Sequence, residues 1–304
     1  MTFYLTVLGA NSALPAAGRH PSAQIITIRD VPFLIDCGEG TQIQMNRFRI
    51  KRSKIDHVFI SHLHGDHVLG LVPLLNSFAL NRRKRNLHIY GPAPIQAFIT
   101  HQMECTQSHL PYPIHFHELE AETTLPILNT GEVKVHAIAL QHRLPTFGYI
   151  FRECQQPPHI LPEELKKRGI PYSDIPKIKS GEEVQSESGE WIAPEELTRP
   201  SDPPRSFAYI SDTRYLPELY KKIKKIDLLY HEATFLHELL DRAKETQHST
   251  AREAAMVARD ANAKQLIIGH YSTRYQNLDP LKEEARAIFE NTLFAIEGNT
   301  YPVD

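Results

Sequence analysis

The sequence of 304 residues predicts an α/β fold. Short apolar runs rich in valine and isoleucine recur along the chain, and stretches with helical periodicity lie between several of them. Hydrophobic residues make up 41% of the chain, which is enough to bury a full core in one large domain. We therefore expect residues 1–304 to form a single domain of two β-rich halves, with helices alternating between strands.

The individual elements follow from the spacing of apolar residues. Strands are predicted near residues 3–8, 24–28, 33–36, 57–60, 87–90, 133–140, 146–151, 206–211, 226–231, 264–268 and 293–296. Helices are predicted near residues 68–80, 92–103, 249–262 and 279–290. In these four stretches apolar residues return every three or four positions. Ser249 or Thr250 can cap the third helix, and Asp279-Pro280 is a typical start for the fourth.

Three histidines and an aspartate lie close together after the predicted strand at 57–60. They are His62, His64, Asp66 and His67, in the sequence Ser-His-Leu-His-Gly-Asp-His. His62 and His64 alternate, so in extended backbone their side chains point the same way. Imidazole and carboxylate ligands suit borderline divalent metals, zinc first, with manganese and iron as alternatives. Unrelated loop residues rarely reach this density, so the motif predicts a metal site, and we expect two ions.

Two ions need more than four ligands, and three later positions fit. His142, Asp212 and His270 each follow a strand-like run. Taken singly, each would be an ordinary loop residue. Loops at strand ends are where a layered α/β protein gathers its chemistry, so the repeated placement predicts that all three join the cluster.

Six blocks spread over nearly the whole chain share one family pattern. They are residues 8–15, 34–42, 61–67, 231–235, 248–250 and 269–275. The block at 61–67 resembles the metal motif of the metallo-β-lactamase superfamily. The last three blocks read His-Glu-Ala-Thr-Phe, His-Ser-Thr and Gly-His-Tyr-Ser-Thr-Arg-Tyr, and they resemble the ribonuclease Z family in particular.

The resemblance implies a more specific architecture than periodicity does. It implies a four-layer αβ/βα metallo-β-lactamase sandwich with a protruding arm. Residues 153–205 are rich in proline, lysine and glutamate, and they are too long for an ordinary connection in a compact domain. The resemblance implies that they form a flexible arm inserted in the domain, an exosite that grips the tRNA away from the cleavage site. A disordered surface insertion is the alternative.

The resemblance also implies how the ligands divide between two Zn²⁺ ions per chain, with Mn²⁺ or Fe²⁺ as alternatives. One ion would be held by His62, His64 and His142. The other would be held by Asp66, His67 and His270, with Asp212 bridging both. Superfamily members with two redox-active irons place a carboxylate where this chain has Gly65, so redox chemistry is disfavoured.

The implied activity is that of a zinc-dependent endoribonuclease. It would cleave the 3′ trailer from precursor tRNA by two-metal phosphodiester hydrolysis, leaving a 3′-hydroxyl on the tRNA and a 5′-phosphate on the trailer. Asp66 would act as general base as well as ligand. His248 would protonate the leaving oxygen, oriented by Glu232, and Arg274 would bind substrate. The alternatives are a small-molecule phosphodiesterase or thioesterase of the same superfamily and a silent RNA-binding subunit, although no ligand is missing here.

The net charge of −2 is unusual for a protein that binds RNA phosphates, so local basic clusters have to supply the contacts. Two clusters flank the metal motif, one made of Arg47, Arg49, Lys51, Arg52 and Lys54 and the other of residues 82–85. A solvated face is the ordinary explanation of such clusters, but the position beside the motif modestly favours RNA contacts. The lysines between 221 and 225 we interpret as a solvated face.

Composition favours an intracellular enzyme. The three cysteines are odd in number and widely spaced, so no disulfide framework is expected. The chain starts with a strand-like run, and it lacks an apolar segment long enough to cross a bilayer. We therefore expect a cytoplasmic protein that does not contact membranes, and the family resemblance implies a homodimer.

Overall fold

The computed structural model describes residues 2–304, which divide into two compact units. The larger, which we call the core unit, comprises the chain up to Asn129 together with Val133–Arg152 and Arg205–Asp304. The smaller, which we call the arm unit, comprises Thr130–Glu132 and Glu153–Pro204. Each unit has its own cluster of buried apolar side chains, so each is described by itself.

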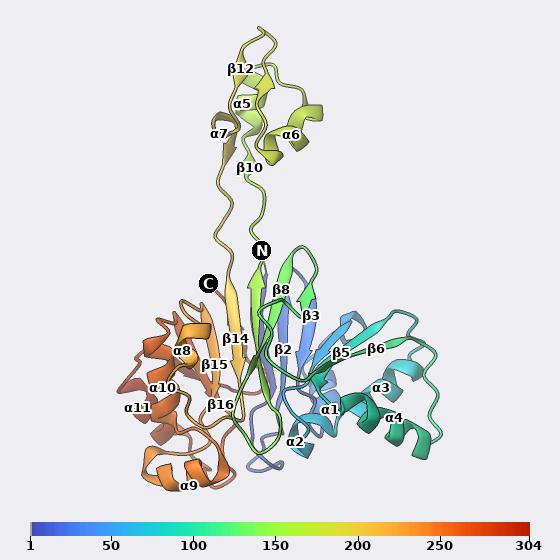
Figure 1. The fold of residues 1–304 in the computed structure, drawn as a ribbon, viewed down its shortest axis with the longest axis vertical. Coiled ribbons are helices and arrows are strands. Elements are labelled where there is room, and N and C mark those ends of the chain that lie inside the picture. The colour runs from blue at the N-terminus through green and yellow to red at the C-terminus, as the bar shows by residue number, and fades with distance from the viewer. Residues whose placement is uncertain (1) are drawn as a thin grey trace. The chain divides into compact units, whose positions relative to one another are not determined.

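The first sheet of the core unit has seven strands (Figure 1). In spatial order they are β18 (Thr300–Pro302), β1 (Phe3–Gly9), β2 (Ala23–Ile28), β3 (Val31–Ile35), β4 (His57–Phe59), β5 (Leu87–Pro92) and β6 (Ile114–Leu119). The pairs from β18 to β3 are antiparallel, and those from β3 to β6 are parallel. The parallel strands therefore end at one edge, and β4 delivers the metal motif there.

The second sheet also has seven strands and repeats this mixed topology. In spatial order they are β17 (Thr292–Phe294), β16 (Gln265–Gly269), β15 (Leu228–Glu232), β14 (Ser206–Ile210), β9 (Phe147–Glu153), β8 (Val133–Ala139) and β7 (Leu128–Asn129). Strands β14 to β17 are parallel to one another, and β14 is antiparallel to β9. Parallel strands buried on both faces read as continuous apolar runs, as β14 and β16 do.

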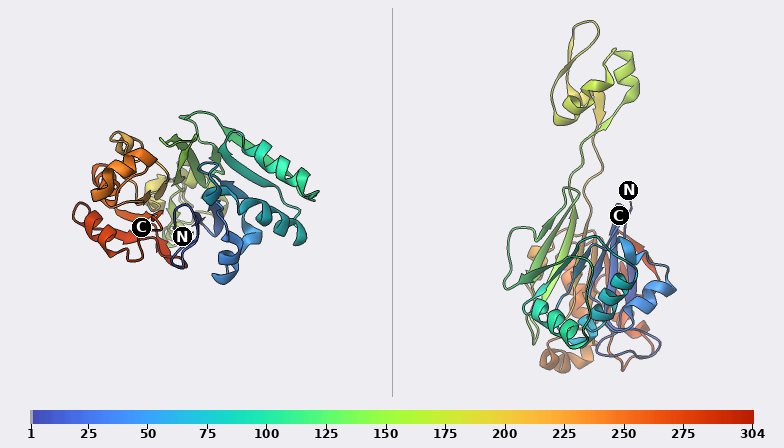
Figure 2. Two further views of the ribbon diagram at one scale, coloured as in Figure 1. Left: turned by 90° about the horizontal axis from the view of Figure 1, so that it is seen from below. Right: turned by 90° about the vertical axis from the view of Figure 1, so that its right-hand side faces the viewer.

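Alternation along the strands explains why the first sheet is covered on both faces. In β3, Phe33 and Ile35 belong to the apolar cluster between the sheets, whereas Leu34 belongs to the cluster under the outer helices. In β4, Phe59 belongs to the cluster between the sheets and Val58 to the cluster under the outer helices. Figure 2 shows the two sheets face to face with helices outside each. The four-layer αβ/βα sandwich implied by the resemblance is confirmed for the core unit.

The four predicted helices of the core unit are present with shifted ends, and three further short helices, at residues 41–47, 219–222 and 240–246, were not predicted. The helices of this unit are α1 (Thr41–Arg47), α2 (Gly65–Val68), α3 (Leu71–Leu80), α4 (Ile95–Cys105), α8 (Leu219–Lys222), α9 (Leu240–Thr246), α10 (Ala251–Asp260) and α11 (Asp279–Arg286), with 3-10 turns η1 (Arg52–Lys54) and η3 (His237–Leu239). Thr250 caps α10 in a capping box with Glu253. No helix among residues 2–304 has the length and apolarity to cross a membrane.

Two differences from the predicted elements have physical causes. The predicted helix at 68–80 is divided into α2 and α3 at Gly70, which packs so closely that a Cβ there would lie 2.0 Å from the carbonyl oxygen of Gly38. Strand β6 was not predicted, because only three of its six residues are apolar and its glutamate is of a type depleted in strands. Tertiary pairing with β5 makes it a strand.

The arm unit is built from short elements. They are β10 (His159–Ile160) paired with β13 (Thr198–Arg199), β11 (Val184–Gln185) paired with β12 (Trp191–Ile192), helices α5 (Pro162–Lys167), α6 (Ile175–Ser180) and α7 (Pro194–Leu197), and the 3-10 turn η2 (Tyr172–Asp174). Its apolar core consists of Leu165, Ile170, Ile178, Val184, Ile192 and Leu197. So small a core leaves the unit marginal in stability.

We predict that Ile178→Ala unfolds the arm unit locally while leaving the core unit folded. Ile178 is fully buried in the small arm cluster, and truncation of a buried isoleucine costs about 2–5 kcal/mol. Hydrogen exchange measured by mass spectrometry should rise across residues 153–204 and stay unchanged in β14 to β16. The matched control is Lys179→Ala at an exposed neighbour, and equal exchange in both variants would contradict the prediction.

Candidate metal centre

The predicted ligands come from separate segments and meet at one edge of the two sheets. His62 and His64 follow β4, and Asp66 and His67 lie in α2. His142 follows β8, Asp212 follows β14 and His270 follows β16. The structure brings all seven side chains together, although they span more than two hundred positions in the sequence.

Three histidines and one carboxylate oxygen form the first group. His64 presents Nδ1, which lies 2.9 Å from Nε2 of His62 and 3.3 Å from Nε2 of His142. Asp212 presents Oδ2, which lies 3.5 Å from His62 and 3.7 Å from His142. Four potential ligand atoms therefore converge on one point.

The second group is formed by Asp66, His67, His270 and the other oxygen of Asp212. The Nε2 atoms of His67 and His270 are 3.3 Å apart. Oδ2 of Asp66 lies 3.5 Å from His67 and 3.8 Å from His270, and Oδ1 of Asp212 lies 3.2 and 3.1 Å from the same two nitrogens. Because Asp212 turns one oxygen to each group, its geometry is that of a bridging ligand.

These separations fit the donor set of two small dications. For metal–nitrogen bonds of about 2.0–2.1 Å, neighbouring ligands of a tetrahedral zinc ion lie about 3.3 Å apart. The ligand atoms of the two groups are separated by 2.9 to 3.8 Å. The lone pairs of two neighbouring imidazole nitrogens repel each other at such distances unless a proton or a cation lies between them. The arrangement therefore fits metal ions.

The second nitrogen of the histidines is fixed by hydrogen bonds that leave the first one free to ligate. Nδ1 of His142 donates to the backbone oxygen of Gln247 at 3.0 Å, which leaves Nε2 as the acceptor. Nδ1 of His67 lies 2.8 Å from Asp36, and Nδ1 of His270 lies 2.9 Å from Thr234. Such supporting hydrogen bonds are typical of metal-ligating histidines.

The local charges also favour cations. Burial lowers the pKa of His62 well below its usual value, so its imidazole stays neutral and able to ligate. Burial would lower the pKa of His67 too, but the carboxylates of Asp212, Asp36 and Asp66 raise it well above its ordinary value. Among residues 2–304, every ion pair of Asp212 is with a histidine. These three carboxylates, of which Asp36 and Asp212 are buried and Asp66 is partly buried, pair with no lysine or arginine among the described residues, and they leave negative charge for metal to neutralise.

Asp36 is a supporting residue to which the sequence reasoning assigned no role. Its buried carboxylate accepts hydrogen bonds from the backbone N–H and the hydroxyl of Ser61, from Nδ1 of His67 and from the hydroxyl of Tyr209, all between 2.7 and 2.9 Å. Asp36 directly follows β3, as the ligands follow their strands, and that placement was the available signal. Asp36, Asp212 and His270 also share a positive φ of 56 to 59°, a strained conformation typical of functional sites.

His248 and Glu232 form a pair beside the ligands. Both oxygens of Glu232 lie 3.1 Å from Nδ1 of His248. Glu232 is fully buried, and it also accepts hydrogen bonds from Thr213, Thr234 and Ser249. Burial lowers the pKa of His248, but the charge and hydrogen bond of Glu232 outweigh burial and raise the pKa to about 9. His248 is therefore protonated at neutral pH.

His248 also lies within reach of the metal ligands. One nitrogen of His248 and ligand atoms of Asp212 and His270 are within 4.8 Å of one another. The ring centroid of His248 is 5.0 Å from that of His142 and 5.3 Å from that of His270. Because Glu232 occupies Nδ1, only Nε2 of His248 is available to the site, either as a proton donor or as a further ligand.

A cleft of 450 Å³ opens over the ligands. It is lined by His64, Asp66, His142, Asp212, His248 and His270, by the loop from Ser12 to Pro15, and by Pro21, Glu39, Gly65, Leu69, Arg143, Arg242 and Thr246. The N–H of Ala13 donates to Asp66 at 2.7 Å and so fastens the loop to the site. The sequence reasoning missed Arg143 and Arg242 at the rim, of which Arg242 forms an ion pair with Glu245 at 2.6 Å.

Arg274, the predicted substrate-binding residue, does not line this cleft. Its guanidinium lies over the ring of Phe235 at 5.0 Å, and Nε donates to Ser272 at 3.1 Å. Phe235 in turn makes an edge contact with His248, with centroids 6.2 Å apart. Phe235 therefore lies between Arg274 and His248. A role of Arg274 in substrate binding stays a prediction.

The fold and the donor set together define the class of the protein. Two mixed sheets packed face to face, with a cluster of histidines and aspartates at the strand ends, are typical of metal-dependent hydrolases with the metallo-β-lactamase fold. Comparison with known proteins supports this class. A family model described as the anti-Pycsar protein Apyc1 matches residues 3–154, half of the chain.

Closer relatives identify the family. Ribonuclease Z of Bacteroides fragilis is 43% identical over 97% of this chain and 97% of its own length. Ribonuclease Z of Cytophaga hutchinsonii is 42% identical over 100% of this chain and 97% of its own length. The crystal structure of the short form of human tRNase Z covers 99% of both chains, with 26% identity and a TM-score of 0.73.

The chain therefore belongs to the ribonuclease Z family, the metal-dependent endoribonucleases of the metallo-β-lactamase superfamily. Its residues 3–154 also belong to the sequence family of Apyc1. The resemblance found in the sequence and the prediction of an enzyme are confirmed.

We predict that His62→Ala and His270→Ala each lower the amount of bound metal, because each removes a ligand atom from a different group. Elemental analysis of purified protein should show the loss. The control is His117→Ala, which removes a histidine of β6 outside both groups. Wild-type metal content in the two ligand variants would mean that the ligands are misassigned.

We predict that Glu232→Gln lowers the pKa of His248, because the neutral amide removes the charge that opposes burial. In the metal-free protein, NMR titration should give a pKa near 9 for His248 and a lower value in the variant. The raised pKa contributes stability that is complete below the unfolded-state pKa of about 6.5 and is lost as pH rises through about 9. The stability difference between the two proteins should therefore shrink over this window, and a constant difference would contradict the assignment.

Proposed function

We propose that the protein is a zinc-dependent endoribonuclease that removes the 3′ trailer from precursor tRNA by two-metal phosphodiester hydrolysis. Cleavage would leave a 3′-hydroxyl on the tRNA and a 5′-phosphate on the trailer. The observation that carries the proposal is the pair of ligand groups that share Asp212, beside the hydrogen-bonded pair of His248 and Glu232, in a chain of the ribonuclease Z family. Nitrogen and carboxylate donors favour zinc, with manganese and iron as alternatives.

The roles of the residues follow from their surroundings. Two ions, when bound, would lower the pKa of a shared water to near neutral and act as Lewis acids on a phosphate oxygen. Burial would raise the pKa of Asp66, but His67 and hydrogen bonding with His270 and His67 lower it well below its usual range. A carboxylate of such low basicity suits a ligand. It would serve as general base only for a water that is already acidified.

His248 is the proposed general acid. Glu232 holds Nδ1 and keeps the ring protonated at neutral pH, so Nε2 carries a proton and is directed into the cleft that His248 lines. The leaving 3′-oxygen of the tRNA needs that proton. Glu232 would act only as a positioning residue, because its carboxylate is buried behind His248 and Ser249.

The cleft offers Arg143 for the phosphates around the scissile bond, and Arg242 if it exchanges its partner Glu245 for a phosphate. Arg143 and Arg242 line the cleft, and guanidinium groups bind phosphate by charge-assisted, often bidentate hydrogen bonds. Arg274 remains a proposed contact for nucleotides that extend beyond the cleft over Phe235.

We propose that the arm unit is the exosite for the tRNA, as the family resemblance implies. The net charge of this unit is negative, which is unexpected for a tRNA-binding segment. Residues 153–204 carry eleven acidic and six Lys or Arg side chains. Contact through many phosphates is therefore disfavoured for this unit. Exposed aromatic rings offer another route, because Trp191 is 63% and Tyr172 68% exposed, and such rings stack on bases or riboses.

The homodimer and the cytoplasmic location stay predictions from the family resemblance. A small-molecule phosphodiesterase or thioesterase would use the same ligands but would not need the arm unit. Substrate specificity therefore separates it from the ribonuclease.

We predict that the purified protein with zinc or manganese cuts a precursor tRNA once, at the 3′ end of the mature sequence. End mapping should find a 5′-phosphate on the trailer. His248→Ala should keep its metal and lose about 10²- to 10⁴-fold in rate, as expected for a missing general acid. With a nitrophenyl phosphodiester, whose leaving group needs no proton, the loss should be small.

Two results would contradict the proposal. Parallel loss of metal and activity in His248→Ala would make His248 a ligand. Rapid hydrolysis of small diesters or thioesters, without cleavage of precursor tRNA, would favour the small-molecule hydrolase.

A further inference from the structure

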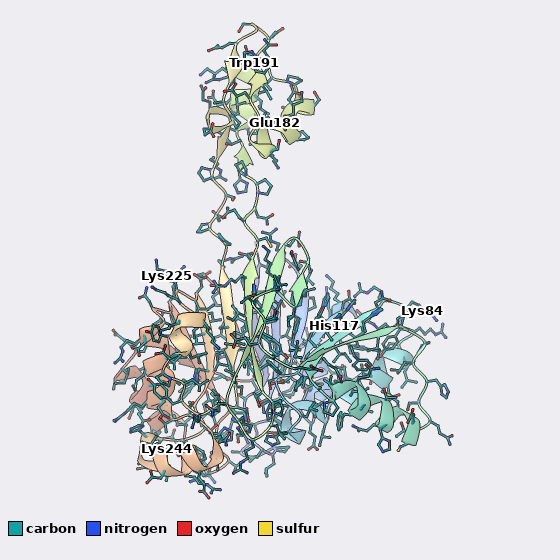
Figure 3. The ribbon with its side chains drawn as sticks, viewed as in Figure 1. Lys84, His117, Glu182, Trp191, Lys225 and Lys244 are labelled. Carbon is teal, nitrogen blue, oxygen red and sulfur yellow. The ribbon has the colours of Figure 1, made fainter. Side chains whose placement is uncertain are left out.

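Two basic segments that are apart in the sequence form one surface on the core unit. The first is the end of α1 and the turn η1, and the second is the connection between α3 and β5. We define the basic surface as Arg47, Arg49, Lys51, Arg52, Lys54, Arg82, Lys84 and Arg85. Figure 3 places Lys84 at the outer end of the first sheet, on the opposite side of the core unit from Lys225.

Arg83 is the residue that joins the two segments. It is only 8% exposed, and it donates to the backbone oxygens of Ile55, Arg85 and Asn86 and to the carboxylate of Asp56. Arg85 adds bonds to Asp56 and to the backbone of Ser53, both at 2.8 Å. The guanidinium of Arg83 is therefore occupied by hydrogen bonds within the protein. These bonds hold the two basic segments together.

The surface is hollowed into two adjacent grooves. One, of 580 Å³, is lined by Arg49, Lys51, Lys54 and Phe48, with a single acidic residue, Asp30. The other, of 640 Å³, is lined by Asn46, Lys51, Arg52, Ser53, Phe78, Asn81, Arg83, Lys84 and Arg85. Ile50 and Lys51 line both grooves, so the two lie side by side.

Four exposed cations of this surface lack partners, whereas two lysines beside α8 have them. Among residues 2–304, Arg49, Lys51, Lys54 and Lys84 form no ion pair or side-chain hydrogen bond. In contrast, Lys221 pairs with Glu218 and Lys222 with Glu122 beside α8. Unpaired cations held close together repel one another, which favours an anionic partner.

Helix α1 connects this surface to the cleft. Glu39 lines the cleft, α1 begins at Thr41 and ends at Arg47, and the basic surface starts there. At about 1.5 Å per residue, α1 is about 10 Å long, so Arg47, the first cation of the basic surface, lies about one helix length from Thr41. A polyanion that leaves the cleft along α1 would therefore reach the cations within a few nucleotides.

We propose that the basic surface binds the sugar–phosphate backbone of the RNA whose scissile phosphate lies in the cleft. The proposal rests on the proposed function, and it explains how a chain with net charge −2 and an acidic arm unit binds RNA. The contacts would be independent of the RNA sequence. Lysine and arginine side chains would bind the phosphates, and phosphate contacts carry no information about the bases.

The test replaces four unpaired cations: Arg49→Gln, Lys51→Gln, Lys54→Gln and Lys84→Gln in one variant. Binding of mature tRNA, which carries no trailer, is measured by fluorescence anisotropy between 50 and 300 mM salt. The variant should bind about tenfold or more weakly at low salt, and the slope of log affinity against log salt should fall by about one for each phosphate that the variant no longer neutralises. Hydrolysis of a nitrophenyl phosphodiester should be unchanged, because the cleft keeps its ligands.

The matched control removes four charges on the other side, in Lys221→Gln, Lys222→Gln, Lys224→Gln and Lys225→Gln. It should bind tRNA as the wild type does. Equal binding by the two variants, or a wild type whose tRNA affinity ignores salt, would overturn the proposal. If the wild type binds tRNA through this surface but does not cut precursor tRNA, the surface stands and the proposed function fails.

Discussion

The carboxylate of Asp36 is the interaction on which the site most depends. It lies at the end of β3 and is fully buried, where an unpaired charge would be very costly. Four hydrogen bonds satisfy it, and they come from three places: the turn after β4 at Ser61, the ligand His67 in α2, and Tyr209 in β14 of the second sheet. One charge thus fixes the metal motif and ties the two sheets together at the edge where the remaining ligands emerge.

At this same edge, like charges and backbone strain make the folded state locally unfavourable in the absence of a ligand. Carboxylates of Asp66 and Asp212 are crowded beside Asp36, and His270 and Asp212 hold positive φ angles that most residues avoid. Such a site is stable when cations neutralise it, so metal binding and folding stability are linked. The buried charge of Glu232 is neutralised within the chain, because the protonated His248 supplies the counter-charge.

Charge is distributed unevenly over the protein, and the distribution suggests a division of labour. The core unit carries the ligands, the cleft arginines and the unpaired cations around η1, whereas residues 153–204 of the arm unit have a strong excess of acidic side chains. Electrostatic attraction to RNA would therefore come from the core unit. The arm unit, with its exposed Trp191, would contribute contacts of a kind that salt screens less.

The sequence by itself determined the α/β class, most strands, a cap at Ser249 or Thr250 and the seven candidate ligands, because these depend on local periodicity, residue chemistry and motif spacing. Tertiary structure alone decided the rest. It showed that Asp36 supports His67, that Arg274 lies outside the cleft and that Arg83 joins two basic segments. Each of these depends on distances between residues far apart in the chain, which are set by how the strands align and pack, and no local pattern contains that information.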